Sequence, residues 1–148
     1  MVEITRDLPV GYQFPAITKP MTKERMVVFS DMEHSTCAGH LQLAPPNIHN
    51  DLEFAQSEGF PSLVADGLIT THWVEATMRD LFGMGYYKGG KLMTKYIRPV
   101  YVDDEVTMKL VLKEKVPEGD AMRFNLEVNC FNQSGDLVTV GTASALVR

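Results

Sequence analysis

Cysteines, long apolar runs and basic clusters are all scarce in this sequence. Cys37 and Cys130 are the only two cysteines among 148 residues, and no secretory start accompanies them, so we expect two free thiols instead of a disulfide. No stretch approaches the roughly 20 consecutive apolar residues of a membrane span, and the start, Met1–Asp7, is neither basic nor apolar. These absences predict a cytoplasmic protein that has no membrane partner.

Neither a nucleic-acid surface nor a nucleotide site is indicated. The net charge is −5, and lysine and arginine are scattered among acidic residues instead of forming a basic stripe, which argues against binding to nucleic acid. The sequence contains no Gly-x-Gly-x-x-Gly and no phosphate-binding loop, so no cofactor is expected. With 148 residues and 45% apolar composition, the chain is predicted to fold as one domain spanning residues 1–148.

The N-terminal half predicts short elements. Residues 12–18 can form a short strand, and Thr22 is suited to cap a brief helix that continues through Phe29. Residues 31–46 show no clear hydrophobic period. Asn50 is predicted to cap a second short helix that ends at Gly59.

The C-terminal half contains the stronger signals. Residues 67–82 predict one long helix, with glycines at both ends. Strict alternation of apolar and polar residues predicts strands over 106–112 and 121–132. Turn sequences at 117–120 and 133–136 join these strands to their neighbours as an antiparallel meander. The apolar positions of the long helix recur at three- and four-residue spacing: Leu68, Ile69, Trp73, Ala76, Thr77 and Leu81.

These elements predict an α+β fold. One long helix followed by long antiparallel strands requires the sheet to wrap around that helix to bury its apolar sides. This is the hotdog arrangement, a single antiparallel sheet around one central helix. Such a sheet leaves an edge strand, and pairing of two edges would remove that liability, so a homodimer or a higher even oligomer is expected.

Several motifs together resemble those of the MaoC-like hydratases. Asn47–Asp51 is similar to the end of the family's Asp-x-Asn-Pro-x-His-x-Asp signature, and Ala65–Leu68 is similar to the Ala-His-Gly-Met that opens its central helix. Tyr96–Asp104 is similar to the family's Phe-x-x-Pro-Val-x-x-Gly-Asp segment, and 132–138 to its final hairpin. The resemblance covers most of the chain.

The resemblance implies acid–base chemistry at His49. In the family, a histidine and an aspartate activate water and deliver a proton beside the double bond of an acyl thioester, and an imidazole is suited to this because its pKa lies near neutrality. His49 matches the histidine. Ala44 stands where the family has its aspartate, so the usual pair of residues is incomplete.

The start of the central helix is the expected substrate-binding element. Gly67 matches the glycine whose backbone N–H would stabilise the developing negative charge on the thioester oxygen, helped by the helix dipole. Asn47 and Leu68 are expected to bind substrate beside it. An alternative interpretation of Gly67 is a helix-entry glycine placed for close packing.

Asp66 is the first candidate for the missing acid. It immediately precedes the proposed oxyanion glycine, where the family commonly has histidine or glutamine. A carboxylate at this position would also simply stabilise the helix through its dipole. Asp31 and Glu33, which lie near the family's acid in sequence but are displaced by an apparent insertion, rank below Asp66.

Other residues of interest have structural interpretations. His34, Cys37 and His40 have a spacing that could gather metal ligands, but no fourth ligand is evident, so no metal is expected and a loop over the active-site mouth is favoured. Asp51 fits the first turn of the short helix and is expected to orient backbone. His72 is expected to be non-catalytic. The large residues of the long helix are expected to belong to the core: Trp73, Met78 and Phe82.

The function implied by the resemblance is hydration or dehydration of an α,β-unsaturated acyl thioester carried by coenzyme A or an acyl-carrier protein. Because the aspartate is missing, a double-bond isomerase or a Michael-type cyclase, which needs only one mobile base, is an alternative. A thioesterase is disfavoured because Glu75 is the only acid near the position that such enzymes use. A non-catalytic hotdog subunit of a hetero-oligomer is a further alternative.

Overall fold

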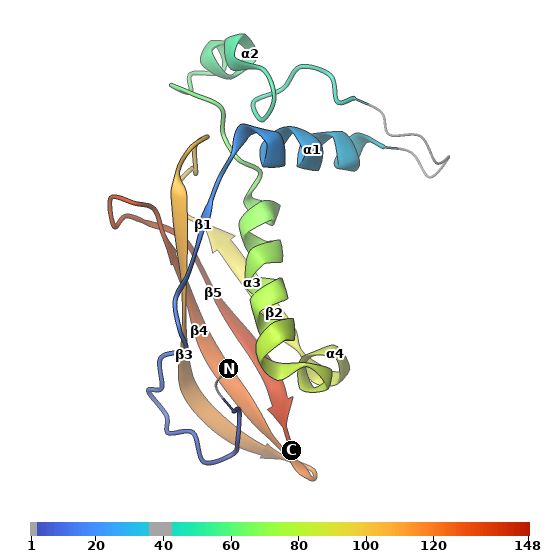
Figure 1. The fold of residues 1–148 in the computed structure, drawn as a ribbon, viewed down its shortest axis with the longest axis vertical. Coiled ribbons are helices and arrows are strands. Elements are labelled where there is room, and N and C mark those ends of the chain that lie inside the picture. The colour runs from blue at the N-terminus through green and yellow to red at the C-terminus, as the bar shows by residue number, and fades with distance from the viewer. Residues whose placement is uncertain (1–2, 36–42) are drawn as a thin grey trace.

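A computed structural model describes residues 3–35 and 43–148 (Figure 1). The elements are β1 (Ile17–Pro20), α1 (Lys23–His34), α2 (Leu52–Ser57), α3 (Gly67–Phe82), α4 (Met84–Gly89), β2 (Lys91–Tyr96), β3 (Glu105–Glu118), β4 (Ala121–Phe131) and β5 (Leu137–Val147). The five strands form one antiparallel sheet in the order β1-β3-β4-β5-β2. The α+β class predicted from the sequence is therefore confirmed.

One face of the sheet packs against α3. Alternate residues of the long strands point toward the helix and are buried, as the alternation in the sequence predicts. Figure 1 shows α3 running along the sheet, with α4 at its C-terminal end. The centre of this core is made by fully buried side chains from the helix and the sheet: Val74, Met78, Met108, Leu112, Phe124, Leu126 and Val128.

The central helix has the predicted bounds. It begins at Gly67, where the carboxylate of Asp66 caps it, and it ends at Phe82, followed by the C-cap Gly83, which has a positive φ of 49°. Met78 is buried, and Trp73 and Phe82 pack partly buried against the core, as expected. No helix within 3–35 and 43–148 is long and apolar enough to cross a membrane.

The two helices before α3 differ from their predicted form. Thr22 caps α1 as expected, but the helix continues to His34, into a segment without apolar period. The prediction that Asn50 caps α2 is wrong. Asp51 is the cap, because its side chain accepts from Phe54 N at 2.8 Å, whereas the Asn50 amide accepts from Asn47 N and stays within its own loop.

The two edge strands of the sheet also differ from the sequence-based prediction. The first strand is shorter than predicted, because β1 covers only Ile17–Pro20 and the chain before it makes an isolated bridge between Gln13 and Val111. The edge strand β2, paired with β5, was not predicted. Helix α4 was also missed, since the glycines around it favour loop.

Candidate functional site

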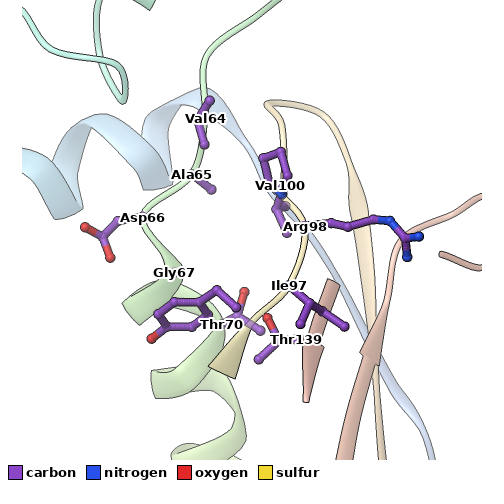
Figure 2. Close-up of a pocket in the computed structure, with 11 residues that line it drawn as sticks. Val64, Ala65, Asp66, Gly67, Thr70, Ile97, Arg98, Val100 and Thr139 are labelled. Carbon is purple, nitrogen blue, oxygen red and sulfur yellow. The ribbon is translucent and has the colours of Figure 1, made fainter. Parts of the chain in front are cut away.

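A cavity of about 270 Å³ lies beside the N-terminal end of α3. Its walls come from two segments that run past each other, Val64–Thr70 and Tyr96–Val100, with Thr139 from β5 (Figure 2). A backbone hydrogen bond joins the two segments, in which Ala65 N donates to the Val100 carbonyl at 2.8 Å. The cavity is therefore framed by backbone held in place on both sides.

His49 approaches this end of α3 from the preceding loop. Its Nδ1 lies 2.6 Å from the carbonyl oxygen of Val64. A carbonyl can only accept, so Nδ1 carries the hydrogen and a neutral His49 has its basic lone pair on Nε2. Nε2 lies 3.8 Å from a carboxylate oxygen of Asp66. The ring is thus oriented with its base toward the start of α3.

The two carboxylate oxygens of Asp66 have different surroundings. Oδ1 accepts from Leu68 N at 2.7 Å and caps the helix, whereas Oδ2 is the oxygen that faces His49. About three quarters of each of the two side chains is shielded from solvent. Capping therefore accounts for one oxygen and leaves the other oriented toward the imidazole, so the structural and the catalytic interpretations of Asp66 are compatible.

Asn47 orients the loop that carries His49. Its side-chain oxygen accepts from the backbone N of His49 at 2.8 Å, and it is not among the residues that line the cavity. Leu68 is also absent from the lining, and its backbone N–H is already bonded to Asp66. Of the three expected substrate-binding residues, Gly67 alone lines the cavity.

Gly67 has a packing reason to be glycine. A Cβ atom at this position would lie 2.6 Å from a ring carbon of Tyr96. The Tyr96 hydroxyl is 2.7 Å from Thr71 Oγ1, which holds the ring against the first turn of α3. Tyr96 also lines the cavity. This place in the site was not predicted from the sequence, although Tyr96 is the aromatic residue that starts the family-like Tyr96–Asp104 segment.

The lower-ranked acids occupy contrasting places on α1. Asp31 is only 6% exposed, and its Oδ1 accepts from the backbone N of Ala44 at 2.7 Å. Glu33 is exposed. The structure thus brings Asp31 against the very position where the family has its aspartate.

His34 and His72, the other histidines within the described residues, have partners of their own. In the candidate metal triplet, Cys37 and His40 lie outside the described residues, while the ring of His34 is 2.9 Å from the Ser30 carbonyl oxygen. Among residues 3–35 and 43–148, no group of three or more potential metal ligands is found. His72 is exposed and lies 3.5 Å from Glu75.

No family model and no curated protein matches this sequence, but solved structures share its fold. R-hydratase PhaJ1 from Pseudomonas aeruginosa has a TM-score of 0.75 and 21% identity over 95% of this chain and 83% of its own. A MaoC-like dehydratase from Rhodospirillum rubrum has a TM-score of 0.72 and 21% identity over 95% and 93% of the two chains.

A chain of the ChsH1–ChsH2 complex from Mycobacterium tuberculosis has a TM-score of 0.73 and 17% identity, and the match covers 95% of this chain and 98% of that one. At these identities the likeness concerns the fold and not the chemistry. The protein has the hotdog fold of the MaoC-like hydratases and dehydratases, as its sequence motifs predict.

Proposed function

We propose that the protein adds water to, or eliminates it from, an α,β-unsaturated acyl thioester, with His49 as the general base. The observation that carries this proposal is the orientation of His49, whose Nδ1 is bonded to the Val64 carbonyl while Nε2 faces Asp66 beside the first turn of α3. A base fixed in one tautomer and paired with a carboxylate is suited to successive proton transfers.

The proposed hydration begins at Nε2. His49 removes a proton from water while the water oxygen bonds to the β-carbon, and the electrons of the double bond move onto the thioester oxygen. The Gly67 N–H, at the positive end of α3, donates to that oxygen. Asp66 Oδ2 then receives the proton from the imidazolium and passes it to the α-carbon, which restores the thioester carbonyl. Dehydration follows the reverse order.

The proposed substrate is carried by coenzyme A or an acyl-carrier protein. Support comes from the fold shared with hydratases and dehydratases and from a cavity that combines apolar walls with the N-terminal end of a helix. We further propose a homodimer or a higher even oligomer formed through sheet edges, since the edge strand β2 has backbone groups available for pairing on one side.

A second candidate is a hotdog subunit that acts with a partner chain. It is favoured by Ala44, which leaves the family's acid position empty, and by the likeness to a chain from the ChsH1–ChsH2 complex. The contacts around His49 argue against it, because a subunit without chemistry has no need of an imidazole held in one tautomer.

A substrate screen with mass-spectrometric readout tests the function. Purified protein is incubated with enoyl and 3-hydroxyacyl thioesters of coenzyme A and of an acyl-carrier protein. A gain or loss of one water supports the proposal. An isomeric product of unchanged mass with a shifted double bond or a new ring would assign isomerase or cyclase chemistry instead. Complete absence of turnover by the homo-oligomer would favour the partner-dependent subunit.

A further inference from the structure

Helix α1 carries two consecutive buried polar residues, Ser30 and Asp31. They are 2% and 6% exposed, although large apolar residues of the same helix, Val28 and Met32, are mostly exposed. Burial of a hydroxyl or a carboxylate is costly unless each is hydrogen-bonded. Met26 is the buried apolar residue near the start of α1, so this inversion indicates that the C-terminal part of the helix makes a polar contact.

That contact is the loop that carries His49. Ser30 Oγ accepts from the side-chain amide of Asn47 at 3.0 Å, and Asp31 Oδ1 accepts from Ala44 N at 2.7 Å. The other end of the Asn47 side chain accepts from His49 N at 2.8 Å. Two side-chain links therefore join a helix to the loop, and one of them leads directly to the backbone of the proposed base.

The loop has a second set of polar bonds. The Asn50 amide donates to the Pro45 carbonyl at 3.1 Å, and its oxygen accepts from Asn47 N at 2.8 Å. These bonds shape the loop internally but do not anchor it to another element. Anchoring to α1 depends on Ser30 and Asp31, because a carboxylate that accepts from a backbone N–H makes one of the stronger hydrogen bonds available.

We propose that Asp31, together with Ser30, is a positioning residue that holds His49 with Nδ1 on the Val64 carbonyl and Nε2 toward Asp66. The significance of this orientation for turnover rests on the proposed function. Asp31 replaces the missing family aspartate in space but not in chemistry: it fixes the backbone at Ala44 and contacts neither His49 nor the cavity wall in the interactions described.

Two variants of Asp31 separate positioning from acid catalysis. Asp31→Asn keeps an oxygen that accepts from Ala44 N, whereas Asp31→Ala removes it. We expect Asp31→Ala to lower kcat about 10- to 100-fold with a much smaller change in KM, because a small misplacement of a catalytic group is costly. Asp31→Asn should restore most of kcat. Glu33→Ala, an exposed acid on the same helix, is the matched control and should behave as wild type.

The tautomer of His49 gives a readout that does not require turnover. Long-range ¹H–¹⁵N NMR of the imidazole should show the Nδ1–H form in the wild type and in Asp31→Asn. In Asp31→Ala it should show a mixture, since a ring released from its carbonyl partner exchanges between tautomers. Ser30→Ala loses only the bond to Asn47 and should shift the tautomer population in the same direction by a smaller amount. It takes the place of Asp31→Ala in this test if that variant does not fold.

Each result has a distinct meaning. An unchanged His49 tautomer in both Asp31→Ala and Ser30→Ala would overturn the positioning role. Equal loss of kcat in Asp31→Asn and Asp31→Ala, with an unchanged tautomer, would make Asp31 the acid. If no thioester is turned over but the tautomer shifts as expected, the positioning role stands and the proposed function fails.

Discussion

The two halves of the molecule are stabilised by different interactions. The sheet and α3 enclose an apolar core in which alternate strand residues are fully buried. The helical extension, defined as α1, α2 and residues 43–51, lies across the N-terminal end of α3 in Figure 1. It adds Met26 and Ala55 to the apolar core, and hydrogen bonds from polar side chains to backbone shape its loop and helix ends. His49 belongs to the extension, and Asp66 belongs to the packed half, defined as the sheet with α3, α4 and the segment that leads into α3. The proposed site therefore lies where the two parts meet.

The largest effect should come from the base itself. His49→Ala is expected to lower kcat by ~10²- to 10⁴-fold, because a general base in an active site contributes that much. The thermal midpoint should stay close to wild type, since the ring is not part of the apolar core. Steady-state kinetics and thermal unfolding of the same samples measure both.

His72→Ala is the matched control for this variant. His72 lies on α3, is exposed and pairs with Glu75 at 3.5 Å. Its replacement should leave kcat unchanged. A loss of kcat in His72→Ala as large as that in His49→Ala would remove His49 from its special role.

Truncation of a core residue of the sheet should lower stability strongly, whereas truncation of His49 should lower kcat with little loss of stability. Phe124, on β4, is 0% exposed and packs edge-to-face against Phe82. Phe124→Ala is expected to lower the free energy of unfolding by about 3–5 kcal/mol through the cavity it leaves. Urea titration measures this loss.

The corresponding truncation in the extension should cost little. Phe54 on α2 is 39% exposed, and Phe54→Ala should cost under about 1 kcal/mol. Similar losses in the two variants would contradict the view that apolar packing is concentrated in the sheet half.

The buried thiol of Cys130 should make the stability of the packed half depend on pH. Burial raises the pKa of this thiol to about 12, so the folded state retains its proton where the unfolded state, with a pKa near 9.0, loses it. The stabilising contribution is complete below pH 9 and is lost as pH rises toward 12. Relative to Cys130→Ala, the wild type should lose about 1 kcal/mol between pH 8 and pH 10.

Urea titrations of the two proteins at both pH values measure that difference. The Cys37→Ser background removes the second thiol. An identical change with pH in the wild type and in Cys130→Ala would show that the thiol ionises as easily in the folded state as in the unfolded one.

The smallest effect concerns the turn that precedes β3. Asp103 has a φ of 68°, and its N–H donates to the carbonyl of Met21, just before the extension begins. Glycine adopts this conformation without strain, and alanine does not. Asp103→Gly should therefore be about 1 kcal/mol more stable than Asp103→Ala in urea. Equal stabilities would mean that the turn imposes no backbone preference.

The sequence predicts the packed half well because its signals are local. The apolar period of 67–82 yields the exact bounds of α3, and the alternation over 121–132 yields β4. Edge strand β2 was missed because its side chains are largely exposed and it becomes a strand by pairing with β5, a contact distant in sequence. Helix α1 was predicted too short, since its buried polar residues break the apolar period.

The sequence suggested some members of the candidate site but not its geometry. The family-like motif pointed to His49, and the position of Asp66 before Gly67 pointed to the second carboxylate, whereas Asn47 and Leu68 do not line the cavity and Tyr96 was not predicted. No spacing indicates that one Asp66 oxygen caps the helix while the other faces His49, or that Asp31 reaches the backbone of Ala44. These relations depend on how the extension lies on α3.

The variant Asp66→Asn decides whether Asp66 serves the chemistry of His49 in addition to capping α3. Asparagine keeps an oxygen for Leu68 N, so the free energy of unfolding should change by under about 1 kcal/mol. The amide cannot relay a proton, so kcat should fall at least ~10²-fold with KM changed far less. A kcat close to wild type with unchanged stability would contradict the account and reduce Asp66 to a helix cap.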